Sequence, residues 1–204
     1  MTSHYLLTGL LIGFSIAAPV GPIGVLCIRR TLAQGRIVGL LSGLGAATAD
    51  AFYGCVAGFG LTAVSALLLG QQQWLALTGG LFLCYLGIKT LRSSSADMPT
   101  QAQQQSFVSA YASTFFLTIT NPATILSFAA IFAGLGLAGT RGDYLAATVL
   151  VAGVFSGSAL WWLALSMGVS IVRERINAKQ LGWINRISGL IILGFGVAIL
   201  LTLL

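Results

Sequence analysis

One aspartate, Asp50, stands in the middle of an apolar stretch, GLGAATADAFYG, whereas Asp97, Asp143 and Glu174 fall in polar segments. A carboxyl group inside a membrane span is costly and is by default a candidate for function. It would suit a group that takes up a proton on one side of a membrane and releases it on the other, or one that faces a substrate ammonium. The alternative is a protonated carboxyl that only hydrogen-bonds a neighbouring helix. We predict that Asp50 is the proton-coupling residue.

Two proline motifs interrupt other apolar stretches. The segment AAPVGPIG carries Pro19, Gly21 and Pro22, and Asn121 with Pro122 takes the corresponding place in a later stretch. Proline removes an amide donor and clashes with a carbonyl of the preceding turn, so a helix break is predicted at each motif. In lipid, the freed backbone groups need protein or a wet cavity. The alternative is that these prolines only kink packed helices.

The helices are predicted to restart at about Gly24 and Thr124. The first amides of a helix lack partners and carry the positive end of the helix dipole, which suits the carboxylate of a small substrate. Tyr53, one turn after Asp50, would add a hydroxyl nearby. The predicted substrate-binding residues are Pro19, Gly21, Pro22, Gly24, Tyr53, Asn121, Pro122 and Thr124.

The elements that position these residues must cross a membrane. Of 204 residues, 57% are hydrophobic and 7% are charged, and the mean hydropathy is +0.95, whereas soluble domains are about 25% charged. Long apolar segments without alternation favour helices over a transmembrane barrel. The fold class predicted is an all-α integral membrane protein with six transmembrane helices. The spans are expected at about 5–28, 37–59, 74–91, 107–134, 144–168 and 184–204. The segment 61–70 is too short to span, and it extends the second helix or lies at the interface.

The two halves of the chain resemble each other. GPIGVL at 21–26 aligns with NPATIL at 121–126, residues 43–60 align with 153–168, and residues 79–91 align with 188–200. In this alignment Ser158 falls roughly opposite Asp50. An odd number of spans per half inverts the second half, as in many secondary transporters. We therefore expect two inverted three-helix repeats, 1–91 and 107–204, joined by a cytoplasmic linker at 92–106, with helices 1 and 4 broken near mid-membrane.

The charge of +6 comes from basic residues scattered over the ends of the spans, which is not a nucleic-acid signal. Taking alternate loops, nine of the ten basic residues fall on one side, and Arg141 alone falls on the other. The positive-inside rule places the richer side in the cytoplasm and both termini outside. The simplest interpretation of each basic residue is that it only sets the topology and contacts anionic lipid. The basic residues of the richer side are Arg29, Arg30, Arg36, Lys89, Arg92, Arg173, Arg175, Lys179 and Arg186.

Several function classes are disfavoured. Cys27, Cys55 and Cys84 are odd in number and include no CxxC pair, which argues against disulfides and a metal site. A thiol–disulfide carrier would need paired cysteines at the two breaks, yet Ser127 stands opposite Cys27 in the alignment of the halves. An intramembrane serine protease needs a base, and the one histidine, His4, lies at the outer end of the first span. No GxxxxGK[ST] motif is present for ATP-driven transport. We expect neither an enzyme nor a cofactor.

Taken together, PVGP at 19–22, GLGAATADAFYG at 43–54 and TNPATILSF at 120–128 resemble the LysE-type amino-acid exporter family over almost the whole chain. The resemblance implies efflux of an amino acid or related small metabolite across the bacterial inner membrane, by antiport with protons. By motif, Pro19, Gly21 and Pro22, then Asp50, then Asn121 and Pro122 take the family positions. Many members carry lysine after the Asn-Pro pair, where this chain has Ala123.

Two functions stay open at this point. The leading one is a secondary exporter of a small zwitterion, with protons and membrane lipid as its other partners and no nucleic acid. The alternative is a divalent metal-cation exporter of similar layout, although one intramembrane carboxylate is thin support for a site of hard oxygen ligands. Glycine-rich helix faces would serve contacts within the chain or in a homodimer, so the oligomeric state is left open.

Overall fold

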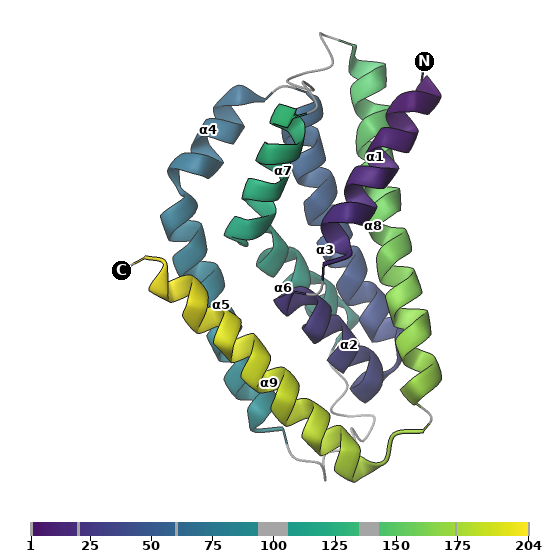
Figure 1. Cartoon of the computed structure of the whole chain (residues 1–204), viewed down its shortest axis with the longest axis vertical. Coiled ribbons are helices and arrows are strands. Elements are labelled where there is room, and N and C mark those ends of the chain that lie inside the picture. Colours follow the sequence, from purple (N-terminus) through teal and green to yellow (C-terminus); the bar gives the residue numbers. More distant parts are fainter. Residues whose placement is uncertain are drawn as a thin grey trace.

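The computed structural model describes residues 2–19, 21–59, 61–93, 106–134, 143–173 and 175–203, and its regular structure there is helical throughout. Figure 1 shows long helices side by side, with the N-terminus at one end of the molecule. The predicted linker falls almost wholly outside these residues, as does Arg141. The helices are α1 (Thr2–Ala17), α2 (Pro22–Gln34), α3 (Arg36–Gly58), α4 (Thr62–Gly70), α5 (Gln72–Leu91), α6 (Phe107–Ile119), α7 (Pro122–Gly134), α8 (Tyr144–Arg173) and α9 (Ala178–Leu201).

Four of these helices, α3, α5, α8 and α9, are long and apolar enough to cross a membrane. Two bent pairs bring the number to as many as six if each pair is one span. The α1–α2 pair is bent by 80° and the α6–α7 pair by 61°. The chain is therefore an all-helical, multi-pass membrane protein with four to six candidate spans.

The helices after the bends begin earlier than the sequence suggested. α2 starts at Pro22 and α7 at Pro122, not at Gly24 and Thr124. Proline is favoured at the first position of a helix, because its missing N–H would lack a partner there and its φ is already helical. The prolines thus open the second half of each pair. The segment 61–70 is also distinct from the helix before it, because α3 ends at Gly58 and α4 is a separate short helix.

Glycine allows a close and extensive contact between α1 and α8. A Cβ built on Gly13 would lie 2.0 Å from the carbonyl oxygen of Val154, and one on Gly157 would lie 2.0 Å from that of Leu10. Such spacing has no room for any side chain. Small residues at a membrane helix interface permit this backbone approach, and these glycines serve contacts within the chain.

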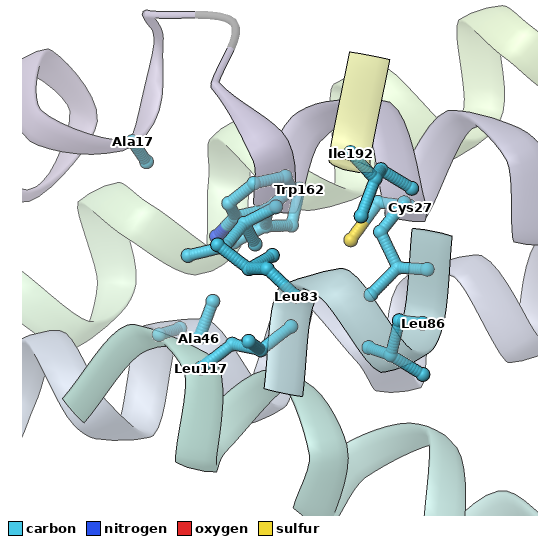
Figure 2. Close-up of a cluster of buried hydrophobic side chains, with 11 residues drawn as sticks. Ala17, Cys27, Ala46, Leu83, Leu86, Leu117, Trp162 and Ile192 are labelled. Atoms are coloured by element: carbon cyan, nitrogen blue, oxygen red, sulfur yellow. The ribbon is translucent and has the colours of Figure 1, made fainter. Parts of the chain in front are cut away.

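α3 lies at the centre, packed against α6 on one side and α8 on the other, while α5 pairs with α9. α2 lies between the α3–α6–α8 group and the α5–α9 pair, and it contacts α3, α8 and α9. Figure 2 shows part of the resulting core, a cluster to which α5 contributes Leu83 and Leu86, α9 contributes Ile192, α8 contributes Trp162 and α2 contributes Cys27.

The end of the molecule opposite the N-terminus collects the α2–α3 connection, the end of α5 and the α8–α9 connection (Figure 1). Arg36, Arg92 and Arg173 are exposed in these connections or at their edges. Arg29 and Arg30 were grouped with these loop residues in the sequence analysis, but they are not in a connection. They lie within α2, because this helix continues to Gln34, and Arg30 is 1% exposed.

Candidate functional site

The break between α1 and α2 leaves backbone amides without side-chain partners. α1 ends at Ala17, and Gly21 takes the cap position of α2 in an extended conformation, with no side chain to accept a hydrogen bond. The Val25 N–H bonds the Gly21 carbonyl at 3.0 Å. The amides of Ile23 and Gly24 come before that first helical bond and have no capping side chain. They form the positive end of the α2 dipole.

At the second break, between α6 and α7, side chains hydrogen-bond some of the freed backbone groups. Asn121 precedes Pro122, and its Oδ1 accepts the Ala123 N–H at 3.1 Å, so this side chain caps α7. The Tyr53 hydroxyl of α3 donates to the Ile119 carbonyl at 2.5 Å. One of the carbonyls freed at the end of α6 is thereby satisfied within the protein.

Both breaks border one small cavity of about 80 Å³. A water molecule takes up about 30 Å³ of the liquid, so the cavity has room for two or three waters or a group of that size. Ala46 and Asp50 of α3, Thr118 of α6 and Trp162 of α8 complete the wall. Seven of the nine residues that the sequence singled out line it: Pro19, Gly21, Pro22, Gly24, Asp50, Asn121 and Thr124.

The other two predicted residues do not line this cavity. Tyr53 is 3% exposed and packs its ring against Phe128, with centroids 5.3 Å apart, while its hydroxyl holds the end of α6. Tyr53 therefore stabilises the break between α6 and α7 and does not face the cavity. Pro122 borders a separate hollow, which is lined by residues of α4, the start of α5 and the end of the chain after α9.

Asp50 is 3% exposed and bonded to a hydroxyl. Ser158 Oγ donates to Asp50 Oδ2 at 2.7 Å, and Trp162 Nε1 donates to Ser158 Oγ at 3.2 Å. Because an indole N–H can only donate, the Ser158 oxygen is an acceptor there, and its own proton is left for the aspartate. Within the described residues no ion pair reaches Asp50.

The residues predicted from sequence included neither Trp162 nor Thr118. The spacing of Ser158 and Trp162 was the available signal, because residues four apart share one face of a helix. The alignment of Ser158 with Asp50 was a second signal, since both sit at corresponding places of two helices that pack together.

The comparisons with known proteins agree with this architecture. A family model described as LysE type translocator matches residues 14–203, which includes both breaks and Asp50. The chain belongs to the LysE type translocator family. In this LysE type translocator Ala123 is exposed in the first turn of α7, where its N–H meets Asn121.

Curated relatives cover most of the chain. It is 30% identical over 195 residues to the Bacillus subtilis protein named "Putative amino acid efflux protein YcgF", covering 93% of this chain and 92% of that one. It is 30% identical to the Escherichia coli protein "Uncharacterized membrane protein YahN", over 81% of this chain and 73% of that one. It is 28% identical to "Uncharacterized membrane protein YrhP" of Bacillus subtilis, over 95% and 97%. No solved structure gives a significant match.

Proposed function

We propose that this LysE type translocator exports an amino acid or related small zwitterionic metabolite across the bacterial inner membrane, in exchange for protons and by alternating access. The observation that carries the proposal is the cavity itself. Two helix breaks, far apart in sequence, meet there beside a buried carboxyl group. Family membership and the name of the relative YcgF support an export role.

The cavity offers a partner to each end of a zwitterion. The uncapped amides of Ile23 and Gly24 at the start of α2 suit a carboxylate. Asp50 suits an ammonium group. A proton and an ammonium cannot occupy the same carboxylate oxygens together, so each would displace the other. Such competition at Asp50 gives exchange of substrate for proton when the cavity changes sides only with one of the two bound.

The packing supports two inverted repeats of three spans each. α1 packs along α8, and α6, its counterpart by sequence, packs along α3, the counterpart of α8. Asp50 and Ser158, which align between the halves, bond each other. Contact between matched positions is expected near a pseudo-two-fold axis. In transporters of this layout the substrate site lies between the repeats.

Purified protein in proteoliposomes tests the proposal. Vesicles are loaded with labelled amino acids. Efflux of the label is followed in one assay under a pH gradient, and in a second assay without a gradient but with unlabelled substrate outside. We expect gradient-driven efflux in the parent and its loss in Asp50→Asn, while exchange of substrate for substrate in Asp50→Asn falls less. Thermal melting of Asp50→Asn checks its fold. Unchanged gradient-driven efflux in folded Asp50→Asn would remove the coupling role from this residue.

The divalent-cation alternative is tested with the same protein. A cation site would need further hard ligands, and within the described part of the chain no three His, Cys, Asp or Glu side chains lie together. Thermal stabilisation is measured against a panel of amino acids, Mn²⁺ and Cd²⁺. We expect saturable stabilisation by an amino acid, and stabilisation by metal alone would favour the alternative.

A further inference from the structure

Arg30 is a buried cation that the site described above does not use. It lies on α2, is 1% exposed and donates to neutral oxygens on two other helices. Nη1 donates to Ser42 Oγ at 2.9 Å and to the Ala110 carbonyl at 3.0 Å, and Nη2 donates to Ser113 Oγ at 2.8 Å. One guanidinium therefore ties α2 to both α3 and α6.

The surroundings of Arg30 do not explain it as a stabilising residue. No carboxylate pairs with it in the described residues, and its Nε is buried without a hydrogen-bond partner. Apolar side chains of similar volume often stabilise a core as well as buried charges do, or better. An ionisable side chain inside a membrane span is instead a candidate for function.

Arg30 sits beyond the cavity, toward the Gly35 end of α2. Its partner Ser42 precedes Asp50 by eight residues on α3, which is about 12 Å along a helix. Other hydroxyls gather in the same contact between α2 and its neighbours. Thr114 donates to the Ser42 carbonyl at 2.5 Å. We call Arg30, Thr31, Ser42, Ser113, Thr114 and Ser166 the polar seam.

Ser166 shows that the seam is not built for packing alone. It is 2% exposed, and its Oγ has no hydrogen-bond partner. A Cβ on Gly39 would lie 1.8 Å from Thr31 Oγ1 and 3.3 Å from Ser166 Oγ, so these three residues meet where α2, α3 and α8 touch. A hydroxyl left without a partner in a dry contact is costly. The cost would vanish in a state in which water enters the seam.

The two half-helices after the breaks differ in how they are held. Every residue of α2 is buried or half-buried. On α7, by contrast, Ala123, Leu126 and Ser127 are exposed, and the residue in register with Arg30 is Ala130, also exposed. On the α2 side of the cavity, Arg30 thus hydrogen-bonds α2 to its neighbouring helices. On α7 the corresponding residue, Ala130, has no such group.

We propose that the polar seam is the closed substrate path between the cavity and the Gly35 end of the molecule, and that Arg30 is the latch that keeps it shut. This inference rests on the proposed transport function. Neutral partners suit a latch, because hydrogen bonds to hydroxyls and a carbonyl can be exchanged for water when α2 swings away. Arg30 therefore controls which side of the membrane the cavity faces.

A cysteine reporter in the seam tests the latch. Cys27, Cys55 and Cys84 are replaced by alanine, and Ser166→Cys places a thiol where the native hydroxyl has no partner. The rate of its reaction with a membrane-impermeant methanethiosulfonate is measured in inside-out and right-side-out vesicles. The variants are Arg30→Gln and the double variant Ser42→Ala/Ser113→Ala, which retains the charge. Arg36→Gln, at an exposed arginine, is the matched control.

We expect both seam variants to raise the reaction rate about tenfold or more through a shift toward the open state. The faster reaction should occur from the cytoplasmic face in inside-out vesicles, and Arg36→Gln should have no effect. Size-exclusion profiles identify folded variants, and the double variant decides the outcome if Arg30→Gln does not fold. The latch proposal would be overturned if the folded double variant showed an unchanged reaction rate at the thiol, or if the reaction were equally fast from the other face of the membrane. If the rates rise but the parent moves no amino acid, the proposed function fails and the latch stands.

Discussion

The buried acid at the cavity is held through a short chain of donors from one neighbouring helix. Trp162 fixes the orientation of the Ser158 hydroxyl, and Ser158 fixes Asp50 Oδ2. The carboxyl group therefore has one oxygen committed to the protein. This arrangement gives Asp50 a defined direction without cancelling its charge.

Removal of the Ser158 hydroxyl should impair transport. In Ser158→Ala the carboxylate loses its donor, and a hydrogen bond to a charged group contributes about 1.5–3 kcal/mol. We expect proton-driven efflux to fall by about tenfold or more, since about 1.4 kcal/mol corresponds to a factor of ten. Ser156→Ala, at a half-buried serine of the same helix, is the control and should transport normally. Equal rates in the two variants would contradict a positioning role for Ser158.

At the scale of elements, the two breaks depend on how tightly the helices around them pack. The α1–α8 contact holds the first half of one bent pair against a long helix that also carries Ser158. α1 and α8 approach through glycine, so the position of Ser158 depends on residues that have no side chain.

A single methyl group at this contact should be destabilising. In Gly157→Ala the new Cβ would lie 2.0 Å from the Leu10 carbonyl oxygen, so α1 must move or the helices must separate. Overpacking of this kind costs about 1–3 kcal/mol. Gly168→Ala on the same helix has nothing within 4 Å of the new Cβ, and alanine is the better helix former by up to about 1 kcal/mol. We expect a lower melting temperature for Gly157→Ala only, and a fall for both would point to helix dynamics rather than to packing.

At the scale of the whole molecule, the basic residues predict orientation. The connections that carry Arg36, Arg92 and Arg173 share one end of the molecule, away from the N-terminus (Figure 1). By the positive-inside rule we predict that this end faces the cytoplasm and that both termini face the periplasm. A C-terminal alkaline phosphatase fusion should be active, whereas a C-terminal green fluorescent protein fusion should stay dark. A fluorescent fusion with inactive phosphatase would reverse the orientation.

Local chemistry explains which parts of this architecture were predictable from sequence. Pro22 and Pro122 each prevent one continuous helix through their segment, and Asp50 is conspicuous in an apolar stretch, so most of the cavity residues could be proposed without coordinates. Helix starts were misplaced by two residues because proline opens a helix as readily as it ends one. The burial of Arg30 was not foreseeable, since it depends on three helices meeting around one side chain.

The unequal helix starts at the cavity have one more consequence. The α2 start is uncapped, the α7 start is occupied by its own asparagine, and the acid stands on a third helix. A ligand with a carboxylate, an ammonium and a side chain on one carbon would thus meet three different walls. Its mirror image could satisfy only two of them at once, so the cavity should discriminate between L and D enantiomers.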